Sequence, residues 1–293
     1  MVFAVLAIQL FVITEAQAAT CGLNSDGEIT DGSLSSGCTV TPDKAYFPIY
    51  KVGLCEEIPT YLNYQTACSI FIDNSIATEV EVSKNNNLSL KNGITLDVGT
   101  YKAAIVLLGN TIGLKHADTF ESNRNGTESN GGLLQKSTGD YCSTRLASGS
   151  EDDLGSGGLE SFLDCADEVL VAGKFTETEG VYLTNGGVSC SINNSGAVVS
   201  SLSVASSSGE TVNFCGMNGS STLETYSNST TTNATRQLAI QTFTTPVVTT
   251  ENTKSIDIGF KLTDMLSLEE RTVGSVVYTN AFIEGLSLTF TVQ

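Results

Sequence analysis

Only one residue of this sequence could do the acid–base chemistry of a histidine. His116 is the one histidine among 293 residues, and it stands in the polar segment Gly113-Leu-Lys-His-Ala-Asp118. A Ser–His–Asp triad would need His116 as its base, and the sequence contains no G-x-S-x-G nucleophile elbow. We therefore expect His116 to be a surface residue and the protein not to be an enzyme.

Eight cysteines form the other set of reactive side chains: Cys21, Cys38, Cys55, Cys68, Cys142, Cys165, Cys190 and Cys215. No C-x-x-C pair occurs, which argues against a zinc ribbon or a thioredoxin-like site. An even number of cysteines in an exported chain is typical of structural disulfides. Pairing of successive cysteines is the simplest of the 105 connectivities that eight cysteines allow, and the others stay open.

Carboxylates offer one weak metal-binding cluster. Glu151, Asp152 and Asp153 are consecutive and could hold Ca²⁺, although a solvated acidic surface is the simpler interpretation. We expect no resident cofactor, and calcium is the one metal ion that the sequence suggests.

A second acidic segment, Asn24–Ile29, resembles the middle of an EF-hand loop, with Gly27 at the sharp turn. Alignment on Gly27 places Gly22 and Ser33 at the two positions that need carboxylates. We therefore expect a turn here and no calcium site.

The charge balance excludes two classes of partner. Lysine and arginine total 14 against 32 aspartates and glutamates, which gives a formal charge of −18. Such a chain repels phosphate groups, so we expect neither nucleic acid nor an anionic membrane surface as a partner. Six N-x-[ST] sequons would be glycosylation acceptors in a secreted protein: Asn87, Asn125, Asn193, Asn218, Asn228 and Asn233.

The first 18 residues predict export. Met1–Ala18 is apolar and ends in Ala16-Gln17-Ala18, which fits the small-residue cleavage rule of a secretory signal peptide. Cleavage would leave no membrane span in the mature chain and would place it outside the cell or on its surface. Two alternatives stay open, because Ala18–Cys21 resembles a lipoprotein cleavage box and the apolar segment resembles the retained N-terminal helix of type IV pilins.

Alternating apolar and polar residues predict strands along most of the chain. The clearest are Ile94–Val98, Ser255–Leu262 and Leu286–Val292. Further strands are predicted at Ala45–Leu54, Ser69–Ile72, Tyr101–Leu108, Lys174–Leu183, Val198–Val204 and Leu238–Phe243. Helical spacing occurs in Leu159–Val171, where we expect one short helix. The predicted domains are 19–140 and 141–293, or alternatively one elaborated β-sandwich over 19–293.

The segment Leu96-Asp-Val-Gly99-Thr-Tyr101 resembles the tyrosine corner of immunoglobulin-like sandwiches. The resemblance implies that the Tyr101 hydroxyl binds back to the preceding loop. The fold class that we expect is all-β, a disulfide-stapled antiparallel β-sandwich of the immunoglobulin-like kind.

Without a catalytic constellation, the function that the sequence favours is structural. We expect an exported extracellular protein that assembles with copies of itself into a surface filament, a pilus-like appendage or a surface layer. Chaperone–usher pilins are similar in being exported β-sandwiches with an alternating C-terminal strand, here Leu286–Val292, although their terminal Gly and Tyr pattern is absent. The alternative is a secreted or surface-anchored adhesin that binds glycans through loops.

Overall fold

A computed structural model of the chain describes residues 19–84, 88–90, 96–109, 111–125, 138–144, 147–149, 163–178, 191–192, 198–200, 202–205, 211–218, 222–223, 236–273, 276–283 and 287–292. The described chain is mostly β-strand in antiparallel sheets, with few helices and three disulfides, which confirms the all-β prediction. The predicted signal peptide, Met1–Ala18, lies outside the described residues.

The helices are α1 (Asp31–Leu34) and α2 (Tyr64–Ala67). The strands up to residue 150 are β1 (Cys38–Val40), β2 (Lys44–Cys55), β3 (Cys68–Ser83), β4 (Leu88–Leu90), β5 (Gly99–Gly109), β6 (Thr111–Lys115), β7 (Ala117–Asn125), β8 (Thr138–Thr144) and β9 (Ala147–Gly149). The later strands are β10 (Leu163–Ala166), β11 (Phe175–Thr178), β12 (Ser191–Ile192), β13 (Val198–Ser200), β14 (Leu202–Ala205), β15 (Thr211–Asn218), β16 (Thr222–Leu223), β17 (Arg236–Thr249), β18 (Ile256–Lys261), β19 (Leu266–Val273), β20 (Val276–Ile283) and β21 (Ser287–Val292).

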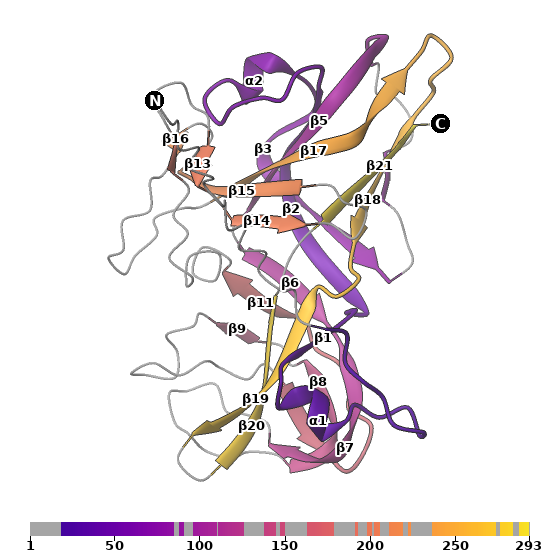
Figure 1. Ribbon diagram of the computed structural model, residues 1–293, viewed down its shortest axis with the longest axis vertical. Coiled ribbons are helices and arrows are strands. Elements are labelled where there is room, and N and C mark those ends of the chain that lie inside the picture. The colour runs from indigo at the N-terminus through magenta and orange to yellow at the C-terminus, as the bar shows by residue number, and fades with distance from the viewer. Residues whose placement is uncertain are drawn as a thin grey trace, which may run out of the picture.

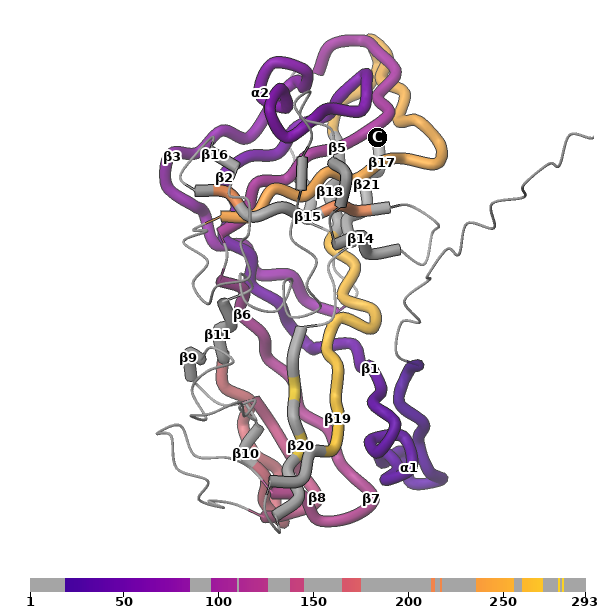
Figure 2. Tube along the Cα trace, turned by 60° about the vertical axis from the view of Figure 1, so that its left-hand side comes forward, coloured from indigo at the N-terminus to yellow at the C-terminus, as the bar shows by residue number. Residues whose placement is uncertain are grey.

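Two large sheets and two small ones arrange these strands. The larger runs β14-β15-β17-β5-β2-β6-β11-β9, with β16 paired to β15 and β3 paired to β2. The second runs β1-β19-β20-β7-β8-β10, and the small sheets are β21-β18-β4 and β12-β13. The molecule is elongated, with β7, β8, β19 and β20 in the lower half of Figure 1 and β15, β17, β18 and β21 in the upper half. Figure 2 shows β1 and α1 on the flank of β19 in the lower half.

Strand β2 joins the two halves, because both of its edges are paired and the strand has β6 beside its first residues and β5 beside its last. One edge pairs with β3 along most of the strand, and the other pairs first with β6 and then with β5. The residues of β2 are buried over most of its length, as expected for a strand with neighbours on both sides.

The core packs on both faces of β5, whose residues from Ala103 to Gly109 are all buried. On one face Ala104, Val106 and Leu108 join the main core, in which Phe260 of β18 stacks on Phe47 of β2 with ring centroids 4.3 Å apart. Burial on both faces explains why this strand reads as a continuous apolar run instead of an alternating one.

The second face of β5 is covered by the connection between β2 and β3. Tyr61 and Tyr64 of this connection are almost fully buried, and they pack with Ile105 and Leu107 in a second core cluster. A segment without regular strands therefore completes the core of the upper half.

Most strand predictions are confirmed, and two predicted elements are wrong. The helix predicted at Leu159–Val171 is not formed in its described part, because Leu163–Ala166 is strand β10, paired with β8, and no helix follows it. Pairing with β8 and a disulfide to Cys142 hold this segment extended, which outweighs its helical spacing. The described end of the predicted strand Ile94–Val98 is a bend that leads into β5.

Both large sheets contain strands from either side of residue 140. β5 pairs with β17 over ten residue pairs, and β1 pairs with β19. The division into 19–140 and 141–293 stays a prediction, and these pairings favour its alternative, a single unit.

Candidate functional site

Six of the eight cysteines form disulfides between successive cysteines, as the simplest connectivity predicts: Cys21–Cys38, Cys55–Cys68 and Cys142–Cys165. The last two each join residues that lie directly opposite in an antiparallel pair, β2 with β3 and β8 with β10. Cys190 and the side chain of Cys215 lie outside the described residues, so their pairing stays a prediction.

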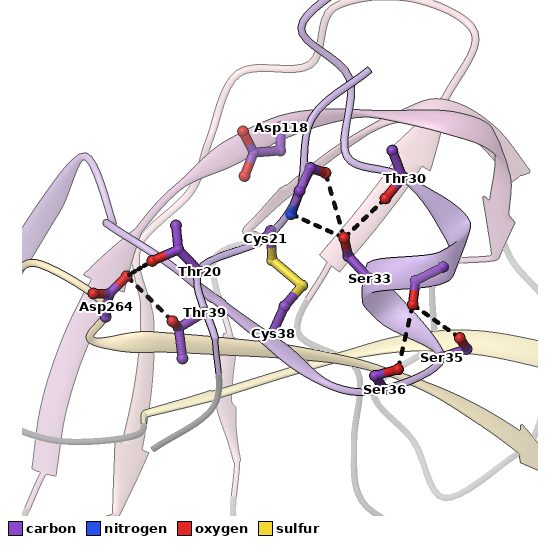
Figure 3. The surroundings of a disulfide bond; sticks show 12 residues. Thr20, Cys21, Thr30, Ser33, Ser35, Ser36, Cys38, Thr39, Asp118 and Asp264 are labelled. Carbon is purple, nitrogen blue, oxygen red and sulfur yellow. Dashed lines mark hydrogen bonds between the residues drawn. A yellow bond between two sulfur atoms is a disulfide. The ribbon is translucent and has the colours of Figure 1, made fainter. Parts of the chain in front are cut away.

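The Cys21–Cys38 disulfide closes a lobe that holds α1 against the six-stranded sheet (Figure 3). The backbone of residues 19–21 runs beside β1, since the Cys21 N–H donates to the Thr39 carbonyl at 2.9 Å. Asp264, which has a positive φ of 57°, accepts hydrogen bonds from the hydroxyls of Thr20 and Thr39. These contacts fix the lobe to the turn before β19.

The segment that resembles an EF-hand loop is a turn, as predicted. The side-chain oxygen of Asn24 accepts the N–H groups of Asp26 and Glu28 at 2.9 and 3.0 Å, and Gly27 has a φ of +85°. The side-chain amide of Asn24 donates to Glu28, so this carboxylate already has a partner within the turn.

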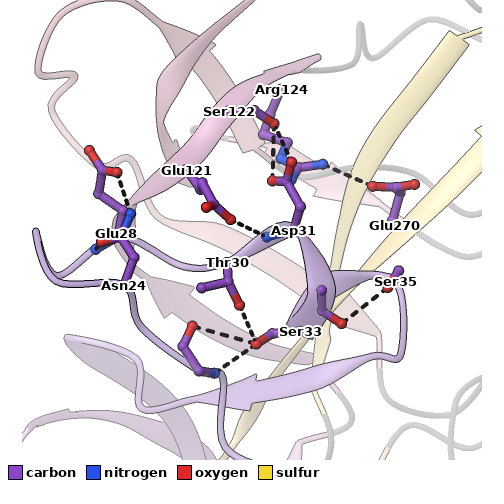
Figure 4. A network of polar contacts seen from close by, with 12 residues as sticks. Asn24, Glu28, Thr30, Asp31, Ser33, Ser35, Glu121, Ser122, Arg124 and Glu270 are labelled. Atoms are coloured by element: carbon purple, nitrogen blue, oxygen red, sulfur yellow. Dashed lines mark hydrogen bonds and ion pairs between the residues drawn. The ribbon is translucent and has the colours of Figure 1, made fainter.

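A buried arginine belongs to a polar network in the lower half (Figure 4). The Arg124 side chain is only 4% exposed and pairs with Asp31 of α1 and, at 2.9 Å, with Glu270 of β19. The Ser122 hydroxyl donates to the same Asp31 carboxylate. The backbone N–H of Asp31 donates to the Glu121 carboxylate. The network ties α1, β7 and β19 together, and it is a structural site.

No local sequence pattern points to Arg124, because its partners are far away in the chain. Asp31 and Glu270 are 93 and 146 residues from it. No local spacing connects them, and an arginine in a polar segment ordinarily indicates a solvated surface.

The prediction that His116 is a surface residue is wrong. His116 is 5% exposed and lies between β6 and β7, where the chain passes from one large sheet to the other. Its Nε2 is 2.5 Å from Asp118 Oδ2, and its Nδ1 is 3.7 Å from Asp43 Oδ2. Two carboxylates beside the ring allow this polar side chain to be buried.

Hydrogen bonds also fix the backbone of His116. Its N–H donates to Thr144 Oγ1 at 3.0 Å, and its carbonyl accepts the Thr144 N–H at 2.8 Å. Thr144 Oγ1 in turn donates to the Gly173 carbonyl at 2.7 Å. The Thr144 hydroxyl therefore links the backbone of His116 to that of Gly173.

A second polar cluster fixes the long strand β3 to β2. Lys44 contacts Glu81 at 2.6 Å, and Lys174 contacts Glu79 at 2.6 Å while it lies over the ring of Tyr46. Burial, and then the hydrogen bond to Glu81, raises the pKa of Tyr46 to about 12. Hydrogen bonds from Lys44 and Tyr46 lower the pKa of Glu81.

The predicted calcium cluster, Glu151, Asp152 and Asp153, lies outside the described residues. Within the described part of the chain, no group of three or more His, Cys, Asp or Glu side chains is arranged to hold a metal ion. Calcium at Glu151–Asp153 therefore stays a prediction.

The two outer strands β3 and β21 differ in the residues that they carry. β3 pairs with β2 and with no other described strand, and it carries Asp73, Glu79, Glu81 and a register shift opposite Tyr50. Charges and bulges protect an edge strand against pairing with other chains. β21 pairs with β18 and with no other described strand, and its sequence SLTFTV has no charge and no proline. β21 lacks the features that protect β3.

Comparison of the chain with known protein families, with curated proteins and with solved structures finds no match. Among the described residues, no helix is long and apolar enough to cross a membrane.

Proposed function

We propose that the protein is an exported structural subunit that assembles with copies of itself into a filament or layer outside the cell. The observation that carries this proposal is the β21-β18-β4 sheet, in which β21 is an uncharged outer strand. Strands of this kind accept another strand through their free backbone groups. The same sheet has β4 at its other end, so copies could add head to tail, and such an arrangement extends as a filament when the rotation between copies does not close a ring.

The disulfides support the extracellular part of the proposal. Disulfides persist in oxidising compartments and are rare in the cytosol of most organisms. Three of them within the described chain fit a protein that must keep its shape outside the cell.

An immunoglobulin-like sandwich is the finer fold that we propose for the upper half. The Phe47–Phe260 stack brings the β21-β18-β4 sheet against the sheet that contains β2. The Tyr101 hydroxyl donates to the Asp97 carbonyl at 2.9 Å, which is the contact that the tyrosine-corner resemblance implies.

Electron microscopy of the purified, disulfide-intact protein tests the proposal. The wild type should form filaments or a regular lattice. Replacing Thr289 and Thr291 of β21 by lysine should disperse these assemblies, since charge on an edge opposes strand addition. The fold should be retained, because Thr291 lies opposite Asp257 in the pair with β18, and a lysine there faces an opposite charge.

The matched control replaces Ser75 and Thr78 of β3, both exposed, by lysine. This variant adds the same charge to an edge that is already protected, so it should assemble like the wild type. Dispersed wild-type monomers at every concentration would contradict the proposal and favour the glycan-binding adhesin, for which a glycan array is the next measurement.

A further inference from the structure

The residue types of β21 read almost the same in both directions. Phe290 has a threonine on either side, and the next position on each side holds an aliphatic residue, Leu288 or Val292. When such a strand pairs antiparallel with an identical strand, similar residues lie opposite each other. The sequence of β21 is therefore complementary to itself.

The sheet topology places this sequence on an outer edge. β21 pairs with β18 over six residues and with no other described strand, and β17 passes close to it without pairing (Figure 1). An outer strand has backbone N–H and C=O groups that a strand of another chain can pair with. A second copy of the protein carries a strand that matches this edge.

We infer that β21 of one copy pairs antiparallel with β21 of a second copy, about a two-fold axis at Phe290. The inference rests on the part of the proposed function that gives the β21 edge a strand of another copy. In this register Phe290 lies opposite the same residue of the second copy, Thr289 lies opposite Thr291, and Leu288 lies opposite Val292. Aromatic pairs and threonine pairs directly across two antiparallel strands favour the pairing.

The lack of charge in β21 fits a contact between identical strands. Two copies of a strand that carries charges of one sign repel each other when they pair. β3 is such a strand, because it contains Asp73, Glu79 and Glu81 and no basic residue. β21 contains no charged residue, so nothing of this kind opposes its pairing with a second β21.

A two-fold contact at β21 joins the two small sheets into one continuous sheet with a β4 strand at each end. Such a contact uses the same surface of both copies and is complete at two copies. Growth beyond the dimer then takes place at the two β4 ends. The dimer is therefore the unit from which a filament or layer would be built.

Analytical ultracentrifugation of the disulfide-intact protein over a concentration series tests this pair. The wild type should form dimers, and Thr289→Lys with Thr291→Lys should weaken their association by about tenfold, because lysine lies opposite lysine in the pair. Thr289→Glu with Thr291→Lys is the matched control. It changes the same two residues but places glutamate opposite lysine, so it should dimerise like the wild type. Within the fold, residues 289 and 291 lie opposite Gly259 and Asp257, so neither variant places like charges directly opposite each other.

The outcomes separate this inference from the filament proposal. Equal association of the two charged variants would overturn the two-fold pair, and the filament proposal would stand if the wild type still forms filaments. Wild-type dimers without filaments would support the pair and contradict the filament. Wild-type monomers at every concentration would overturn both.

Hydrogen exchange of the wild-type dimer keeps the test decisive if a charged variant fails to fold. Slower exchange in β21 than in the monomer, with unchanged exchange in β4, supports the two-fold pair. Slower exchange in both β21 and β4 would show head-to-tail addition and would overturn the inference.

Discussion

At the residue scale, burial of a polar side chain here depends on partners that are remote in sequence. His116 and Arg124 are both about 95% buried, and each is flanked by two carboxylates. Burial of a charged or polar group is unfavourable unless such partners compensate for the lost water.

Arg124→Met tests this compensation. The variant should lose about 2 kcal/mol of unfolding free energy, because Asp31 and Glu270 lose their partner but are exposed enough to regain water. Denaturant unfolding measures the change. Lys102→Met, which breaks an exposed pair with Glu57, is the control and should change the free energy by less than about 0.5 kcal/mol. Equal losses in the two variants would contradict the structural role of Arg124.

The lowered pKa of Glu81 predicts that the folded protein loses stability in acid. Hydrogen bonds from Lys44 and Tyr46 lower its pKa in the folded protein below the value of about 4.3 in an unfolded chain. Its stabilisation is therefore present above this unfolded pKa and is lost as the pH falls through the folded pKa. Glu81→Gln should show a smaller loss of stability on acidification than the wild type.

The measurement is the free energy of unfolding at steps between pH 5 and pH 3. Ser75→Gln, at an exposed residue of β3 without a titratable side chain, is the control and should keep the wild-type pH dependence. If Glu81→Gln and the wild type lose the same unfolding free energy on acidification, Glu81 does not contribute to the loss of stability in acid.

At the element scale, the connection between β2 and β3 acts as part of the core. Cys55 and Cys68 close it at the ends of the two strands, and Tyr61 and Tyr64 from within it cover Ile105. The disulfide and the tyrosines therefore stabilise the same face of the sheet.

Replacing both Cys55 and Cys68 by alanine should cost about 3 kcal/mol, the value expected for a loop of this length. The variant should also expose Tyr61, which near-ultraviolet circular dichroism detects well because the chain has no tryptophan. Replacing Cys21 and Cys38, which have no tyrosine next to them in the sequence, should give a similar loss of stability and leave the tyrosine signal unchanged. A tyrosine signal that stays the same in both variants would show that the connection holds without its disulfide.

At the scale of the whole molecule, strand pairing predicts one cooperative unit. β2 is shared between β3, β5 and β6, and the chain returns from β17 to the lower half through β19. We expect a single calorimetric unfolding transition for residues 19–293, whose midpoint temperature falls as a whole in Arg124→Met. Two transitions, of which that variant shifts only one, would instead support separate domains.

The sequence by itself determined the class of this protein and much of its local structure. The strands around Ala45–Leu54 and Leu286–Val292, the turn at Gly27 and the tyrosine corner at Tyr101 all depend on residues close together in the chain. Period-two alternation, glycine at a positive φ and a hydrogen bond over four residues are local effects, so local patterns predict them. The successive pairing of six cysteines was also the simplest prediction.

Only the tertiary structure decided which residues come together. The strand at Leu163–Ala166, the burial of His116 and Arg124, and the position of Asp43 beside the His116 ring depend on partners that sequence spacing does not reveal. Sheet pairing and the burial of charge are set by free energies of non-local contacts, which outweigh local propensity. For that reason Leu163–Ala166, within the segment with helical spacing, is a strand, and the single histidine is an interior residue.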